Sequence, residues 1–127
     1  MQDRPTAAEL LDALGDFMRD RAANARDRWE RFQFQVAANS IGVLLRESQL
    51  EDGFIREEWR GLDMLLGTEP RPESQPALTN RLNQRNDELV THIREGRFDA
   101  DGEEQLVRHL YETVMNKVRI ASPNEAV

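Results

Sequence analysis

The chain has 127 residues, with 17 basic and 24 acidic side chains, a formal net charge of −7 and no cysteine. These features exclude disulfides, thiolate metal sites and cysteine nucleophiles, and they argue against binding to nucleic acid or to an anionic membrane surface. The length predicts one domain over residues 1–127, with residues 1–5 and 121–127 frayed. Because no apolar run is long enough for a signal peptide or a membrane span, we expect a cytoplasmic protein.

The segment RPTAAELL at residues 4–11 predicts the start of a first helix. Thr6 and Glu9 have the spacing of a capping box, in which the hydroxyl accepts a backbone N–H and the glutamate reaches back. Leucine, phenylalanine and methionine then recur at helical spacing to about residue 21. The stretch 22–26 contains neither glycine nor proline, so a connection and a continuous long helix are both compatible with the sequence.

A second helix is expected over residues 27–49, with apolar residues over so wide an arc that it should be central in the fold. One seam on this helix alternates in steps of three and four residues and consists of Trp29, Phe32, Val36, Asn39 and Val43. Small residues in the middle of the helix would let another helix approach closely. The Asp52–Gly53 pair is expected to end this pattern.

The rest of the chain predicts three more helices. The third spans residues 55–66 with Gly67 as its C-cap, and a proline-rich loop follows over residues 68–76. The fourth spans residues 77–95, where Arg85 and Asn86 interrupt a leucine seam, and the fifth spans residues 102–120. No segment shows the alternation typical of a strand. The predicted fold is all-α, a compact single-domain bundle of about five helices.

The sequence contains no recognisable catalytic, cofactor or metal site. Asp99–Gly102 resembles half of a calcium loop, but the first and last ligand positions would fall on Arg97 and Arg108. His92 and His109 lack the glutamates of a carboxylate di-metal site, and we expect them at part-exposed helix edges. A phosphate-binding loop and a nucleophile–base arrangement are also missing. We therefore expect a protein that is not an enzyme by itself.

Two residues of the second helix are candidates for ligand or partner contacts. The Asn39 amide lies in the apolar seam, where a missing hydrogen-bond partner would cost about 1–3 kcal/mol. It is either a polar residue that fixes helix register or a group that faces a ligand groove or a partner. The Phe34 ring is displaced from Phe32 by about 200° around the helix axis. One of these rings therefore faces a second helix layer or a partner.

Three segments carry a resemblance to a known family: RPTAAELL at residues 4–11, RFQFQVAANSIGVLLRE at residues 31–47 and HLYETVMNKVRIASP at residues 109–123. The chain resembles a family of small bacterial helical proteins of unassigned function. Members of that family accompany aminoglycoside-phosphotransferase-like kinases in acyl-CoA catabolism.

The resemblance implies a small accessory subunit that binds the kinase and orders its acyl-CoA site or lid. The kinase would phosphorylate the hydroxyl of a hydroxyacyl-CoA. An acyl-CoA-dehydrogenase-like enzyme would then eliminate the phosphate and move the hydroxyl along the chain. If arginines hold the CoA phosphates, we expect them to be Arg26, Arg28 and Arg31, although no family motif assigns that role.

A second hypothesis belongs to a different class. The chain would be a self-associating helical bundle, such as a homodimer, that binds an acyl or acyl-CoA ligand without a kinase. The two hypotheses differ in whether the contact residues Asn39, Phe34, Arg28 and Arg31 face a partner protein or a ligand cavity.

Overall fold

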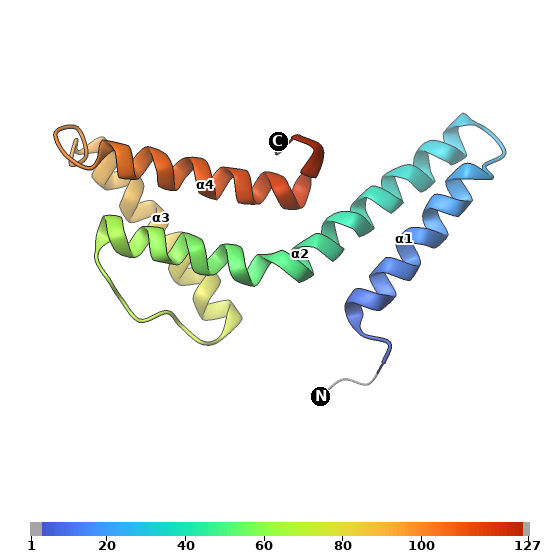
Figure 1. The fold of residues 1–127 in the computed structure, drawn as a ribbon, viewed down its shortest axis with the longest axis horizontal. Coiled ribbons are helices and arrows are strands. Elements are labelled where there is room, and N and C mark those ends of the chain that lie inside the picture. The colour runs from blue at the N-terminus through green and yellow to red at the C-terminus, as the bar shows by residue number, and fades with distance from the viewer. Residues whose placement is uncertain (1–3, 126–127) are drawn as a thin grey trace. The chain divides into compact units, whose positions relative to one another are not determined.

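The computed structural model describes residues 4–125, which form helices and connections and no strand (Figure 1). The elements are α1 (Ala7–Ala23), α2 (Arg28–Leu66), α3 (Gln75–Arg94), α4 (Glu103–Ala121) and a short 3₁₀ helix, η1 (Pro123–Glu125). The all-α prediction is confirmed, and the number of α-helices is four in these residues rather than about five. Part of the expected fraying concerns residues 1–3 and 126–127, which lie outside the described residues. The single-domain assignment stays a prediction.

The first helix begins where the sequence predicts. The Thr6 hydroxyl accepts a hydrogen bond from the Glu9 backbone N–H at 3.1 Å, which satisfies one of the free donors of the first turn. The same hydroxyl donates to the Glu9 carboxylate at 3.3 Å. At the other end, the Asn24 backbone and side chain both donate to the Asp20 carbonyl, at 3.1 and 2.9 Å. The connection after residue 23 is therefore a true helix end.

The predicted break at Asp52–Gly53 is wrong, because α2 runs through it. Gly53 is not one of the described glycines that have a positive φ, and its backbone continues the helix. An interior glycine costs about 1 kcal/mol relative to alanine, which is too little to end a long helix that packs on both sides of it. The helix ends instead at Gly67, whose φ of 104° is accessible to glycine and whose N–H donates to the Asp63 carbonyl at 3.0 Å. The predicted C-cap at Gly67 is confirmed.

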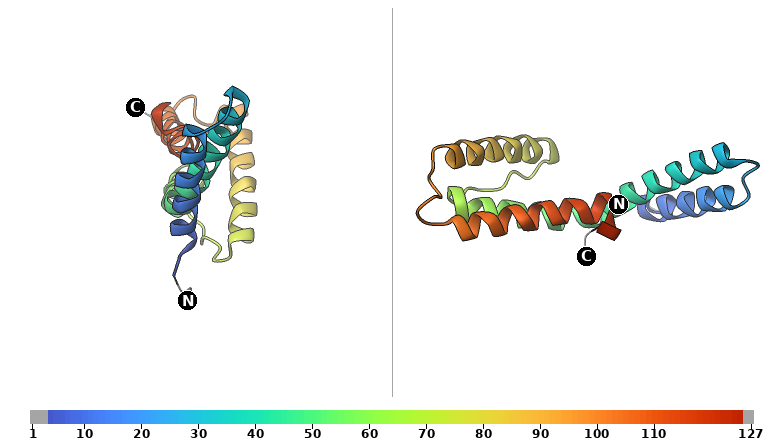
Figure 2. Two further views of the ribbon diagram at one scale, coloured as in Figure 1. Left: turned by 90° about the vertical axis from the view of Figure 1, so that its right-hand side faces the viewer. Right: turned by 90° about the horizontal axis from the view of Figure 1, so that it is seen from above.

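The chain consists of two compact units, Met1–Asp52 with Arg119–Val127, and Gly53–Val118. In the first unit, α1 and the first half of α2 lie side by side and run antiparallel (Figures 1 and 2). Small buried residues, Gly15, Ala22 and Ala38, let the two helices approach. The Arg46 guanidinium also donates to the Ile120 carbonyl at 2.8 Å, which satisfies an acceptor in the last turn of α4.

The second unit contains the end of α2, α3 and most of α4. Its core consists of Leu62, Leu89 and Leu106, which are at most 7% exposed. Partly buried residues surround these three, namely Leu65, Leu66, Leu82 and Phe98. Each helix of the unit therefore contributes a leucine to one shared core, as their apolar spacing predicts.

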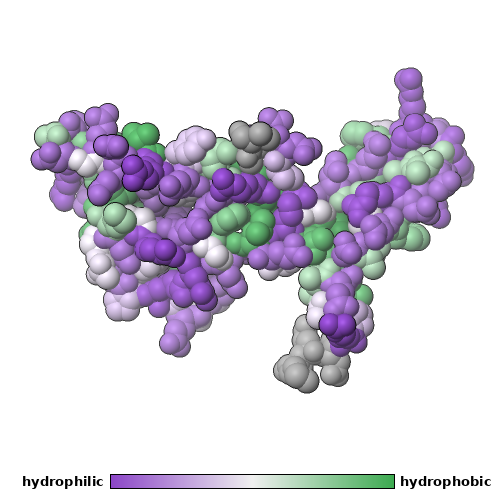
Figure 3. Space-filling model, viewed as in Figure 1, coloured by the Kyte–Doolittle hydropathy of each residue, from purple (hydrophilic) through white to green (hydrophobic). Residues whose placement is uncertain are grey.

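Hydrophobic residues interrupt the mostly hydrophilic surface drawn in Figure 3. The large hydrophobic residues of the first unit that are exposed include Leu10, Leu14 and Phe17 on α1 and Trp29 and Phe32 on α2. Within the described residues, no helix combines the length and apolar character needed to cross a membrane.

Candidate functional site

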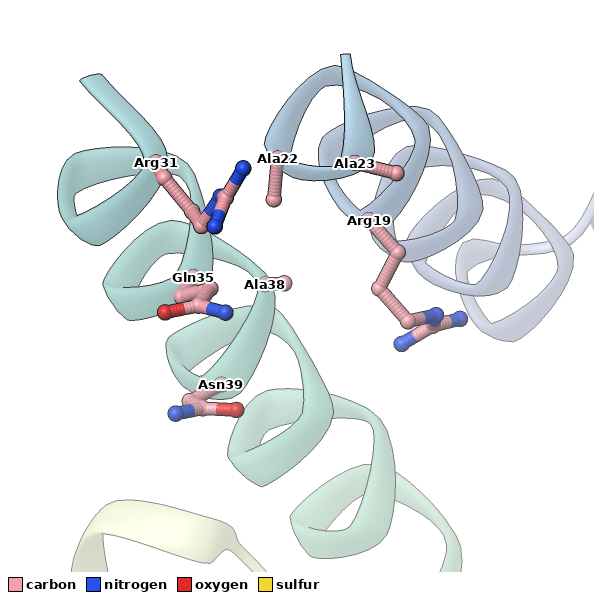
Figure 4. Close-up of a pocket in the computed structure, with 7 residues that line it drawn as sticks. All are labelled: Arg19, Ala22, Ala23, Arg31, Gln35, Ala38 and Asn39. Atoms are coloured by element: carbon pink, nitrogen blue, oxygen red, sulfur yellow. The ribbon is translucent and has the colours of Figure 1, made fainter. Parts of the chain in front are cut away.

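An open pocket of about 390 Å³ lies in the first unit, where α1 faces the first half of α2 (Figure 4). Two buried alanines, Ala22 and Ala38, lie at its apolar part. The polar residues come from both helices and carry guanidinium and amide groups. The complete lining is Arg19, Ala22, Ala23, Arg31, Gln35, Ala38 and Asn39.

On α1, the position of Arg19 depends on a glycine one turn earlier. A Cβ at Gly15 would lie 3.3 Å from Arg19 Nη2 and 3.4 Å from Nη1, so the guanidinium lies in space that the missing side chain leaves. Arg19 Nη2 also donates to the Asp16 carboxylate at 2.6 Å. The free space at Gly15 and the hydrogen bond to Asp16 therefore hold the exposed Arg19 side chain in one position on the surface of α1.

On α2, Arg31, Gln35 and Asn39 follow one another at intervals of four residues, which places them on one helix face. Figure 4 shows the Arg31 side chain directed toward α1 and the two amides following it along α2. Arg31 forms no ion pair with the described residues of the chain. Its charge is therefore available to an external anion.

The structure brings together two of the four residues that the sequence analysis proposed as contacts. Arg31 and Asn39 line the pocket, whereas Arg28 is exposed and does not line it. Phe34 is half-buried and packs under the Arg21 guanidinium, 5.3 Å from the ring centroid. The expectation that Asn39 lies on a buried seam is wrong, because the residue is exposed. In this unit the face that packs on α1 contains Ala38, and Asn39 lies beside it.

Arg26, the third arginine considered for phosphate binding, has an internal partner. Its backbone N–H donates to Glu30 at 2.8 Å, and its guanidinium lies 3.0 Å from the same carboxylate. These hydrogen bonds hold the pKa of Glu30 below its usual value. Arg26 therefore helps to form the turn before α2 and does not line the pocket.

Two aromatic residues near the start of α2 are on the surface, contrary to their assignment to a helix-packing seam. Trp29 is 66% exposed and Phe32 is 55% exposed. Their rings stack on each other with centroids 5.8 Å apart. Val36, one turn further on, is 46% exposed. The spacing is helical as predicted, but the described part of the first unit leaves the first four residues of this seam exposed and buries only Val43 in part.

The second unit contains a buried arginine that the sequence analysis treated as an interruption. Arg85 is 1% exposed and its guanidinium lies over the Trp59 ring, 4.5 Å from the centroid. It donates to the Asp63 carboxylate at 2.8 Å and to the Gly67 carbonyl at 2.7 Å, and its Nε lies 3.4 Å from Glu69. The sequence signal for this buried ion pair was the position of Arg85 in the leucine seam of α3, since a charged residue that is buried there must be paired.

Arg81 continues this ion-pair network on the more exposed side. It donates to both oxygens of Glu69, at 2.8 and 2.6 Å, and to Glu88 at 3.0 Å. The hydrogen bonds from Arg81 lower the pKa of Glu69. Together the two arginines fix the chain that follows α2 against α3, which is a structural role.

His109 is buried at 8% exposure, so its expected place at a part-exposed helix edge is wrong. Its ring lies against Gly61 of α2, where the absence of a side chain leaves room for the ring. Glu58 is also 8% exposed and accepts a hydrogen bond from Asn86 at 3.2 Å. Within the described residues, no group of three or more histidines and carboxylates could hold a metal ion.

Burial lowers the pKa of His109, while the charges of Glu58 and Glu112 act in the opposite direction. Because the pKa of His109 is lower in the folded protein than in the unfolded chain, the unfolded chain binds a proton first as the pH falls. The free energy of unfolding therefore decreases as the pH falls through the ordinary pKa of histidine. We expect wild type to lose more stability than His109→Gln between pH 7.5 and pH 5.5. Urea unfolding at both pH values measures this, and equal losses in both proteins would contradict it.

A family model described as "Domain of unknown function (DUF6285)" matches residues 24–125. The match includes the α2 face of the pocket and the whole second unit, and it begins after α1. No curated protein and no solved structure shows significant similarity to the chain.

Proposed function

The chain belongs to the DUF6285 family, and we propose that it is a non-catalytic accessory subunit of an aminoglycoside-phosphotransferase-like kinase acting on hydroxyacyl-CoA. The class of partner comes from the resemblance of three segments of the sequence. The subunit would bind the kinase and order its acyl-CoA site or lid. The phosphoryl-transfer chemistry then belongs entirely to the kinase.

The observation that supports this proposal is the exposed apolar stripe on α2. Trp29, Phe32 and Val36 follow helical spacing and are all more than two-fifths exposed, at 66%, 55% and 46%. Tryptophan and other aromatic residues dominate the energetics of protein interfaces, and contiguous exposed apolar surface marks such interfaces. A stacked aromatic pair is also rigid, so little side-chain entropy is lost when a partner covers it.

The proposal predicts that the aromatic pair is the main contact with the kinase. We expect Trp29→Ser/Phe32→Ser to weaken the complex by about 30-fold, since truncation of such anchors costs roughly 2 kcal/mol or more. The measurement is affinity for the kinase by calorimetry, with circular dichroism as a test of folding.

The chain offers a matched control for this experiment. Tyr111 and Val114 on α4 have the same spacing and similar exposure, at 65% and 56%. Tyr111→Ser/Val114→Ser should leave affinity unchanged. If both double variants weaken kinase binding equally, or if neither weakens it, the interface is not centred on α2.

The alternative proposal is a self-associating bundle that binds an acyl or acyl-CoA ligand on its own. The observation that favours it is the pocket of the first unit, which joins apolar alanines to Arg31. On this alternative the purified chain elutes as a homodimer and binds acyl-CoA without a kinase. A monomer without acyl-CoA affinity would exclude it and leave the accessory-subunit proposal in place.

A further inference from the structure

We propose that the pocket of the first unit is a binding site for the phosphate group of a small phosphorylated molecule. This inference concerns the isolated chain and goes beyond the proposed function, since it requires neither the kinase nor acyl-CoA. The pocket volume of about 390 Å³ lies in the range of small-molecule sites.

The first argument is the set of hydrogen-bond donors. Arg31 contributes a guanidinium group, and Gln35 and Asn39 contribute amide N–H groups from the same face of α2, while the Arg19 guanidinium lies apart from these three on the α1 side of the pocket. Each of the three α2 side chains could bind a different oxygen of a phosphate, whereas a carboxylate has only two oxygens. A phosphate has more acceptor oxygens, and arginine forks bind it with two parallel hydrogen bonds.

The second argument is charge. Asp16 partly neutralises Arg19 at 2.6 Å, and this ion pair is exposed to solvent. Arg31 has no such partner among residues 4–125. In an acidic chain of net charge −7, a pocket with one paired and one unpaired arginine is a local site of positive charge. Arg31 is therefore the residue on which anion affinity should depend most.

The third argument is positioning. The Arg19 guanidinium lies over Gly15, and the Arg31, Gln35 and Asn39 side chains extend from consecutive turns of one helix. Rigid helices hold donor groups more accurately than loops do. Ala22 and Ala38 leave room beside the donors for the carbon skeleton that carries the phosphate.

The test is a titration of the purified full chain with inorganic phosphate at constant ionic strength, followed by NMR of side-chain N–H signals. We expect shifts at Arg31 Nε and at the Gln35 and Asn39 amides, and at least tenfold weaker binding for Arg31→Gln. Arg28→Gln removes the same charge from the same helix at a residue outside the pocket and should bind phosphate as wild type does.

Three results would overturn the inference. The first is saturation without shifts at Gln35 and Asn39, and the second is equal weakening by Arg28→Gln and Arg31→Gln, which indicates diffuse electrostatic attraction. The third is acetate binding as strong as phosphate binding, which would assign the pocket to carboxylates. Circular dichroism of each variant separates loss of binding from loss of folding.

Discussion

Replacing Arg85 with methionine is expected to lower the free energy of unfolding by about 3 kcal/mol, because the change leaves two carboxylates without their buried partner. Methionine retains the apolar stem of the arginine but cannot bind Asp63 or the Gly67 carbonyl, which now accept at 2.8 and 2.7 Å. It also removes the cation over Trp59. Urea unfolding monitored by Trp59 fluorescence, in a Trp29→Phe background, measures the loss.

Arg81→Met is the matched control for this prediction. Arg81 binds the same Glu69 carboxylate, but its side chain is 30% exposed, so water replaces its partners at little cost. We therefore expect a clearly smaller loss than that of Arg85→Met. Equal losses for the two variants, or a more stable Arg85→Met protein, would show that the buried network does not stabilise the second unit.

Gly61→Ala is expected to destabilise the protein by about 2 kcal/mol, since an added Cβ would overlap the His109 ring. The Cβ would lie 2.7 Å from His109 Cε1 and 3.1 Å from Cγ, inside the distances that side chains tolerate. His109 is buried and has little space to move away. Chemical denaturation measures the change in the free energy of unfolding.

Gly53→Ala, eight residues earlier in the same helix, isolates the effect of the contact. A Cβ at Gly53 would meet nothing within 4 Å, so the higher helix propensity of alanine should stabilise α2 by about 0.5–1 kcal/mol. His109→Ala should also relieve the penalty of Gly61→Ala in a double-mutant cycle. A higher free energy of unfolding for Gly53→Ala together with a lower one for Gly61→Ala would support the account. A loss at Gly53 equal to that at Gly61 would contradict it.

Much of the helical organisation could be predicted from the sequence because its signals are local. Thr6 has the residue type and spacing of an N-cap, and Gly67 has the flexibility that a C-cap needs. Gly53 misled the prediction, since a glycine beside an aspartate is typical of a turn. Whether a helix continues through such a pair depends on packing of the flanking turns, which periodicity does not report.

The candidate site was predicted less completely, because burial is a property of the packed units. The spacing that placed Asn39 on a seam is correct, but sequence does not show that α1 packs on the neighbouring face through Ala38. The sequence analysis proposed Arg31 but not Arg19, the arginine of α1 that also lines the pocket. Arg85 was interpreted as an interruption for the same reason, because its partners lie at the end of α2 and in the loop that follows it.

The most direct test of the accessory-subunit account is the turnover of the kinase with and without this chain. The two proteins are co-expressed, separated by size exclusion and assayed for phosphorylation of a hydroxyacyl-CoA at saturating substrate. The account predicts a co-eluting complex whose turnover exceeds that of the kinase alone. Separate elution together with unchanged turnover would contradict it.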